Sequence, residues 1–164
     1  HQIGFDTEVI SIKEFLNILK ELIILNNIKT YFSIRFTYLV NEIDSWSSNK
    51  SPVFFIAPLI RKRNSANTFK TMVLTETRRI SSLAMSTKTK CGANYINSRY
   101  ALLEAKSKGA DLPILKNTDN FISESPGACI FFIKKGVAIT HSLESDILES
   151  ITRDTVMKIL LENN

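Results

Sequence analysis

The stretch KTKCGANYINSRYALLEAKSKGADLP, residues 88–113, decides the fold and holds the most informative chemistry of the chain. Lys90 stands directly before a turn of small residues, Cys91-Gly92-Ala93, and Tyr95 follows shortly after it. The pattern beyond the turn predicts a helix over 98–108, ended by a glycine in the usual C-terminal position. A primary amine and a phenol are therefore predicted to lie together at the start of a helix.

Strands and helices are predicted to alternate along the rest of the chain. Ser11 and Glu14 have the spacing of a capping box, which predicts the start of an N-terminal helix. The segment 31–40 alternates between apolar and polar residues and predicts a strand with one buried face. Helices are predicted at 11–25, at 98–108 and from about 152, and strands at 31–40, 53–57, 71–77, 111–115, 128–133 and 137–140. This mixture predicts an α+β fold.

Composition and charge limit the classes of function. The 164 residues are 44% hydrophobic and 23% charged, as in ordinary soluble globular proteins. A net charge of +5 is compatible with nucleic acid, an anionic membrane face or a small phosphorylated ligand. Cys91 and Cys129 have neither a CxxC partner nor metal-ligand spacing, so we expect reduced thiols in a cytoplasmic protein and no metal site. The longest apolar stretch, 15–25, is interrupted by polar residues, and we expect no membrane span.

Four motifs follow one another in the second half of the chain: KCGANY at 90–95, SESPGA at 123–128, the predicted hairpin, and SDILESITRD at 145–154. In order and spacing they resemble the class IV aminotransferases, the fold-type IV pyridoxal-phosphate enzymes of the branched-chain aminotransferase type. The resemblance is densest from about Lys88 onward. It implies a pyridoxal 5'-phosphate cofactor and transamination between a branched-chain amino acid and 2-oxoglutarate, in branched-chain amino acid biosynthesis.

The resemblance also implies roles for three side chains. Lys90 corresponds to the lysine that forms the Schiff base with the cofactor aldehyde and later moves a proton at the substrate α-carbon. Such an amine must lose its proton, so we expect it to be desolvated. Tyr95 corresponds to the phenol that binds the phenolate oxygen of the cofactor. Glu124 corresponds to the carboxylate that keeps the ring nitrogen protonated, which makes the ring an electron sink.

Further site residues follow from the same resemblance. Ile151 and Thr152 correspond to the turn at a helix N-terminus that binds the cofactor phosphate. Leu148 corresponds to the apolar residue that packs on the cofactor ring. Arg35 stands where the family often has an arginine near the substrate carboxylate, although a structural ion pair is an equally good interpretation of a strand arginine. Thr152 is also compatible with a simple role as helix N-cap.

Some positions depart from the family pattern. Glu149 and Ser150 replace the usual proline and glycine before Ile-Thr, which puts the fit of this turn to phosphate in question. Ser33 replaces the usual tyrosine two residues before Arg35, so the substrate pocket is harder to assign.

The resemblance implies a two-domain architecture, with a small α/β domain and a large pseudo-barrel domain. Residues 1–58 correspond to the second half of the small domain, 59–70 to the interdomain linker, and 71–164 to the first half of the large domain. This chain therefore corresponds to about half of a usual family member. Family members are usually homodimers, which we expect here too.

Three alternatives remain open. A D-amino-acid aminotransferase or an aminodeoxychorismate lyase of the same class would use the same lysine and glutamate. A non-catalytic fragment is compatible with the same pattern. Nucleic-acid binding is a weaker hypothesis, because no aromatic residues are interleaved with the basic ones; it would use Arg61, Lys62, Arg63, Lys70, Arg78 and Arg79.

Overall fold

The computed structural model describes residues 10–40, 45, 52–60 and 69–163. The chain divides into two units, His1–Thr68 and Phe69–Asn164, here called the N-terminal and C-terminal units. Both contain helices and strands, and each is described by itself. Most of the predicted linker, 61–68, lies outside the described residues, and its first two residues belong to a strand. The predicted domain division, at 1–58, 59–70 and 71–164, stays a prediction.

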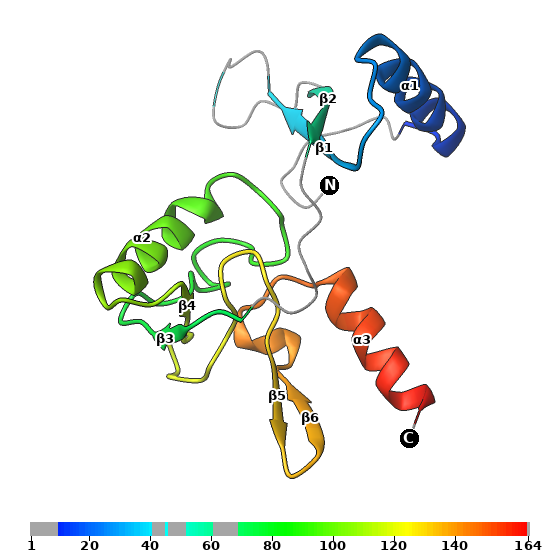
Figure 1. Cartoon of the computed structure of the whole chain (residues 1–164). Helices are drawn as coiled ribbons and strands as arrows, with labels where there is room; N and C mark the ends of the chain where they lie inside the picture. The colour runs from blue at the N-terminus through cyan, green and yellow to red at the C-terminus, as the bar shows by residue number, and fades with distance from the viewer. Residues whose placement is uncertain (1–9, 41–44, 46–51, 61–68, 164) are drawn as a thin grey trace. The chain divides into compact units, whose positions relative to one another are not determined.

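The N-terminal unit consists of a helix and a two-stranded antiparallel sheet (Figure 1). Helix α1 spans Ile12–Leu25, strand β1 spans Phe32–Leu39 and strand β2 spans Val53–Ile60. The Ser11 side chain accepts a hydrogen bond from the N–H of Glu14 at 3.2 Å, which confirms the predicted helix start. In the sheet, Phe32 lies opposite Ile60 and Leu39 lies opposite Val53.

Aromatic contacts join the elements of the N-terminal unit. Phe36 on β1 contacts Phe15 on α1, with ring centroids 5.8 Å apart, and it contacts Tyr38 and Phe54 at 4.9 and 5.2 Å. Phe36 and Tyr38 share one face of the strand, as the alternation predicted. The expected burial is wrong, however, because neither α1, β1 nor β2 contains a buried residue.

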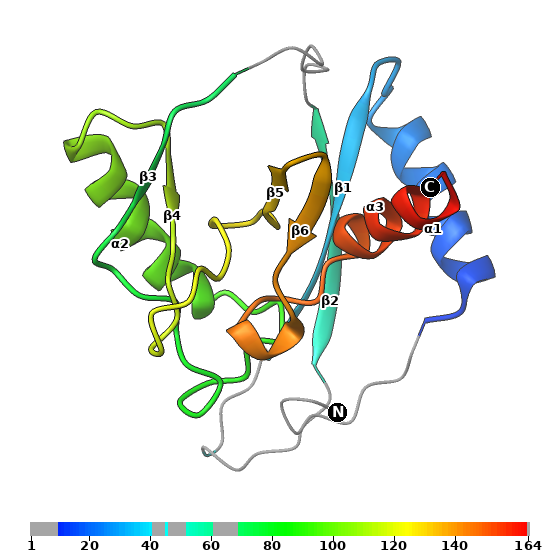
Figure 2. The ribbon, with the colours of Figure 1, turned by 90° about the horizontal axis from the view of Figure 1, so that it is seen from below.

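The C-terminal unit is built around a parallel pair of strands with a helix beside it. Strand β3, Met72–Leu74, pairs with strand β4, Leu112–Ile114, and helix α2, Asn94–Ser107, connects them in the sequence. Figures 1 and 2 both show α2 beside the two strands. Ala101 and Ala105 of α2 are fully buried, and their small side chains allow the helix to approach the strands closely.

A hairpin and two helices complete the C-terminal unit. Strands β5, Phe131–Lys134, and β6, Val137–Thr140, are joined by Lys135 and Gly136, both with positive φ. Two such residues form the tight turn that the hairpin motif predicted. The 3-10 helix η1 spans Leu143–Ser145, and helix α3 spans Ile151–Glu162.

Two helix starts differ from the expectation. Helix α2 begins at Asn94 rather than at Ser98, so Tyr95 lies in its first turn. The N-cap of α3 is Ser150, whose hydroxyl accepts a hydrogen bond from the N–H of Arg153 at 3.2 Å. The suggestion that Thr152 caps this helix is therefore wrong, because Thr152 is already a helical residue.

Candidate active site

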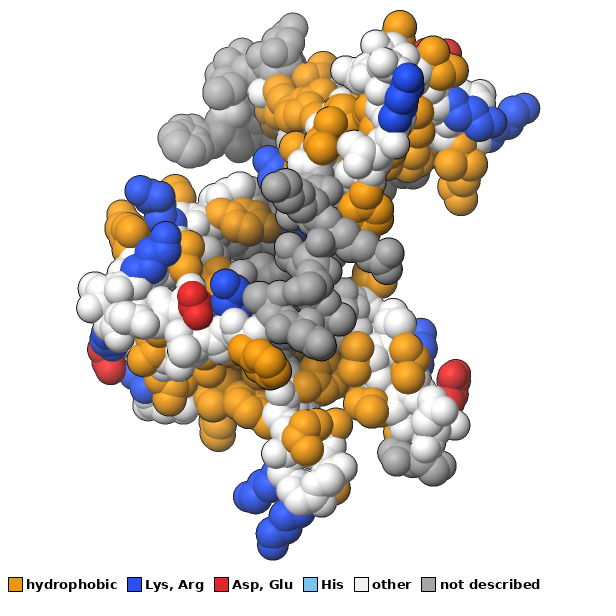
Figure 3. All heavy atoms as spheres, viewed as in Figure 1, with side chains coloured by type: hydrophobic (Ala, Val, Ile, Leu, Met, Phe, Trp, Pro, Cys, Tyr) orange, Lys and Arg blue, Asp and Glu red, His pale blue; other side chains and the backbone are white. Residues whose placement is uncertain are grey.

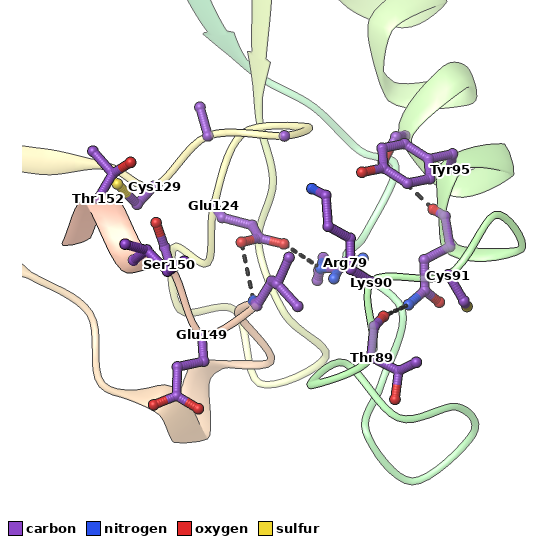
Figure 4. Close-up of a pocket in the computed structure, with 16 residues that line it drawn as sticks. Arg79, Thr89, Lys90, Cys91, Tyr95, Glu124, Cys129, Glu149, Ser150 and Thr152 are labelled. Carbon is purple, nitrogen blue, oxygen red and sulfur yellow. Dashed lines mark hydrogen bonds and ion pairs between the residues drawn. The ribbon is translucent and has the colours of Figure 1, made fainter. Parts of the chain in front are cut away.

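A cavity of about 310 Å³ lies in the C-terminal unit, a size that suits a small ligand. Its walls come from Arg79 and from three separate segments within 89–98, 124–129 and 148–152. Six residues predicted to bind the cofactor line this cavity: Lys90, Tyr95, Glu124, Leu148, Ile151 and Thr152. In Figure 4, Lys90 and Tyr95 lie on one side of the view, and Ser150 and Thr152 lie on the other. The fold thus brings the separate motifs to one place, while the role of each residue stays a prediction.

The amine comes from the loop before α2, and the phenol comes from the first turn of this helix. The Nζ atom of Lys90 lies 5.7 Å from the centroid of the Tyr95 ring, within the range of a cation–π contact. The side-chain amide of Asn94 donates to the carbonyl of Thr89 at 3.1 Å and to that of Ser86 at 3.4 Å. Asn94 therefore anchors the loop that carries Lys90. Lys90 is exposed, so the expectation of a desolvated amine is wrong.

Glu124 is a buried acid with two protein partners. Its Oε1 atom lies 2.8 Å from Nε of Arg79, and its Oε2 atom accepts a hydrogen bond from the N–H of Leu148 at 3.1 Å. Burial raises the pKa of Glu124 above its ordinary value, while Arg79, the Leu148 N–H and Lys90 act in the opposite direction. The carboxylate therefore lies at the cavity wall with its position determined from two sides (Figure 4).

The N-terminus of α3 supplies backbone donors to the cavity. The first N–H groups of an α-helix have no acceptor within the helix. Ser150 satisfies the N–H of Arg153, which leaves the N–H groups of Ile151 and Thr152 available for an anion at the positive end of the helix. Ser150 has φ −109° and ψ 123°, an extended conformation, so this position does not require the glycine usual in the family.

Arg79 lines the cavity but is not among the site residues predicted from the sequence. Its side chain is 5% exposed, and Nε also donates to the carbonyl of Asp146 at 3.2 Å. The hypothesis of nucleic-acid binding includes Arg79, which is wrong for a buried arginine paired with Glu124. Arg61, Lys62 and Arg63 of that hypothesis lie outside the described residues. Glu124 is the signal that points to such a residue, because a buried acid requires a cation nearby. The sequence does not identify which arginine or lysine supplies that cation.

Arg35 belongs to the other unit. It is an exposed residue of β1, where it lies opposite Ala57 of β2. The structure describes the two units separately, so the substrate role of Arg35 stays a prediction.

The two cysteines lie in the part of the chain that the structure describes. Cys91 and Cys129 are free, as expected, and both line the cavity. Among the described residues, no group of three or more His, Cys, Asp or Glu side chains could hold a metal ion. No helix in the described part of the chain is long and apolar enough to cross a bilayer.

Comparison with known proteins assigns the family. The family model for amino-transferase class IV matches residues 9–164. The chain belongs to the class IV aminotransferases. A probable branched-chain-amino-acid aminotransferase of Aquifex aeolicus (strain VF5) is 40% identical over 83 residues, which are 51% of this chain and 27% of that protein.

Solved structures of branched-chain aminotransferases share the fold. The branched-chain aminotransferase of Thermoproteus uzoniensis with norvaline matches with a TM-score of 0.86 and 27% identity, over 98% of this chain and 54% of that one. The T.th. branched-chain amino acid aminotransferase complexed with N-(5'-phosphopyridoxyl)-L-glutamate matches with a TM-score of 0.80 and 25% identity, over 96% and 52%. The predicted α+β, fold-type IV class is confirmed, and the chain spans about half the length of these solved structures.

Proposed function

We propose that the protein is a pyridoxal-phosphate-dependent aminotransferase that transfers the amino group between a branched-chain amino acid and 2-oxoglutarate. One observation carries the proposal. A lysine, a tyrosine, a buried glutamate and a helix N-terminus, all from separate motifs, line one cavity. The named activities of the relatives and the glutamate-bearing ligand of one of them support the choice of substrates.

The residues of the cavity fit this cofactor by their chemistry. Glu124 is a carboxylate able to hold a proton on a ring nitrogen, and the N–H groups of Ile151 and Thr152 suit a phosphate. When bound, pyridoxal phosphate supplies a ring that withdraws electrons from the substrate α-carbon. Lys90 would provide the amine that holds the cofactor and that moves a proton at the substrate α-carbon, and Tyr95 beside it would hold a cofactor oxygen. Leu148, which lines the cavity, would supply an apolar surface for the ring.

The binding of the cofactor through Lys90 can be tested by absorbance. The protein, expressed from its complete coding sequence, is mixed with pyridoxal phosphate, and the band of the covalently bound cofactor is recorded. Lys90→Ala is expected to abolish this band and to reduce transamination by at least about 10³-fold, because no other amine replaces the nucleophile. Lys88→Ala, an exposed lysine close in the chain, is the matched control and is expected to keep both. A normal band in Lys90→Ala would refute the proposal.

Substrate assays separate this proposal from the alternatives within the same family. Transfer from L-leucine to 2-oxoglutarate is expected to exceed transfer from D-alanine. Release of pyruvate from aminodeoxychorismate would instead indicate a lyase. If a cofactor band forms but no substrate reacts, the protein is a binding protein without this activity.

The proposal includes a homodimer in the cytoplasm, which the resemblance to the family supports. Sedimentation of the purified protein measures the dimer, and fractionation of the source cells measures the location. A monomeric active enzyme would contradict the first part.

A further inference from the structure

We propose that Arg79 is a positioning residue of this site, which holds the Glu124 carboxylate in one orientation and keeps it negatively charged. The inference rests on the proposed function in one respect, because that function determines which group Glu124 faces when the cofactor is bound. Its structural basis is the contact between these two side chains, and its central test uses the cofactor-free protein.

Arg79 is held by acceptors from two different segments. Its Nε atom lies 2.8 Å from Oε1 of Glu124 and donates to the carbonyl of Asp146 at 3.2 Å. Asp146 is itself buried in the left-handed conformation, with φ 59°, and its Oδ1 atom accepts a hydrogen bond from the N–H of Ser82 at 2.9 Å. The guanidinium therefore cannot turn without breaking contacts to more than one segment. A planar side chain held in this way determines where its carboxylate partner lies.

Glu124 retains the capacity for further hydrogen-bond partners. An ionised carboxylate has about four acceptor positions. Arg79 uses one on Oε1, and the N–H of Leu148 uses one on Oε2. Because Glu124 lines the cavity, a donor inside it can use another position. Only the ionised carboxylate accepts hydrogen bonds at both oxygens, because a protonated carboxyl group donates from one of them.

Arg79 also determines which protonation state is present. A buried carboxylate without a cation tends to take up a proton, because water no longer stabilises its charge. Burial does raise the pKa of Glu124, and Arg79 is the largest influence that opposes it. Arginine stays protonated at all ordinary pH values, so this opposition is constant. Without Arg79, the pKa of Glu124 would be higher, so the carboxylate would already take up a proton at a higher pH.

Other charged and titratable groups face the same carboxylate or line the same cavity. Lys90 acts on Glu124 in the same direction as Arg79, from the loop before α2. Among the described residues, these groups are Arg79, Lys90, Cys91, Tyr95, Cys129 and Glu149, together with Asp146 behind Arg79. Among them, Arg79 is the group in direct contact with a Glu124 oxygen through a charged donor.

The test is a titration of the Glu124 carboxyl in the cofactor-free protein by ¹³C NMR. Arg79→Gln removes the charge and keeps a polar side chain, and the pKa of Glu124 is expected to rise by about one unit or more. Arg78→Gln is the matched control, because Nη1 of Arg78 is buried without a hydrogen-bond partner among the described residues. It is expected to leave the pKa of Glu124 unchanged. An unchanged pKa in folded Arg79→Gln would overturn the proposal.

Arg79→Lys separates charge from position. Lysine keeps the positive charge, so the pKa of Glu124 is expected to stay near the wild-type value. Its single ammonium cannot reproduce the planar contact with Glu124 and Asp146, so kcat is expected to fall roughly tenfold with little change in KM. A folded Arg79→Lys enzyme with wild-type kcat would remove the positioning role, even if Arg79→Gln fails to fold.

The outcomes distinguish this inference from the proposed function. If the wild-type protein shows no cofactor band, the proposed function fails, while the titration of Glu124 still decides the role of Arg79. If Lys90→Ala loses the band but Arg79→Gln leaves both the Glu124 pKa and the acidic limb of the pH–rate profile unchanged, only the inference about Arg79 fails.

Discussion

The two units of the chain differ in the residues that they bury. Every buried residue in the described part of the chain lies in the C-terminal unit, where nine polar or charged residues are buried beside Pro113 and four hydrophobic residues. In the N-terminal unit, the described helix and strands contain no buried residue and are joined by aromatic contacts. Buried polar groups require specific partners, whereas apolar contacts tolerate shifts. The cavity therefore lies in the C-terminal unit, where the partners of buried polar groups determine the positions of the side chains most strictly.

Large hydrophobic side chains are exposed on both units. Ile12, Ile24 and Leu25 of α1 are 75% exposed or more. Figure 3 shows hydrophobic side chains over both units, including the one that contains α1. An apolar helix face exposed to this degree adds little burial free energy. The C-terminal unit is therefore expected to be the more stable of the two, and substitutions can test this directly.

The largest effect is expected from Leu115→Ala. Leu115 is 1% exposed, and its truncation is expected to lower the free energy of unfolding of the C-terminal unit by about 3 kcal/mol, from lost burial and a residual cavity. Denaturant unfolding, followed by signals from each unit, measures the change. Leu83→Ala, at a residue that is 99% exposed, is the matched control and should change it by less than about 0.5 kcal/mol.

Phe36→Ala is the corresponding change in the N-terminal unit. Phe36 makes the ring contacts that join α1, β1 and β2, but it is only partly buried. Its truncation is therefore expected to cost less than that of Leu115. An equal or larger cost would break the comparison between the two units.

The next effect is expected from Glu104→Ala, which disconnects α2 from the loop after β3. Oε1 of Glu104 accepts the N–H of Glu76 at 2.7 Å, and Oε2 accepts the N–H of Thr77 at 2.9 Å and its hydroxyl at 2.8 Å. The loss is expected to cost about 2 kcal/mol near pH 7, mainly through these charged hydrogen bonds. Asp154→Ala, which removes only the exposed pair with Lys158, should cost about 0.3–0.5 kcal/mol.

The contribution of Glu104 should depend on pH. The hydrogen bond to Lys108 and those to the Thr77 and Glu76 N–H groups lower the pKa of Glu104 from 4.5 to about 2. A lowered pKa means that the unfolded chain binds the proton first, so the stabilisation is present above pH 4.5 and is lost as the pH falls toward 2. The stabilities of wild type and Glu104→Ala should converge at the acidic end. A difference independent of pH would show that another interaction is responsible.

Local signals in the sequence predicted the local parts of this structure. The cap at Ser11 and the turn of the hairpin formed by β5 and β6 each depend on neighbours in the chain, and both are present. The family resemblance predicted six residues that line the cavity. Burial of the strands in the N-terminal unit and the contact between Arg79 and Glu124 depend on distant segments. No periodicity or short motif contains that information.

The smallest effects are expected at the two serine caps, which compare the units at equivalent positions. Ser11 caps α1 and Ser150 caps α3, each through a hydrogen bond of 3.2 Å to the backbone N–H three residues on. Replacing either serine by alanine should cost about 1 kcal/mol in its own unit, and Ser150→Gly only a few tenths. Because Ser150 caps the helix whose first residues, Ile151 and Thr152, line the cavity, Ser150→Ala should also weaken cofactor binding, whereas Ser11→Ala should not. Calorimetric titration with pyridoxal phosphate measures the affinities, and equal weakening by both substitutions would mean that the anion site does not depend on the cap of α3.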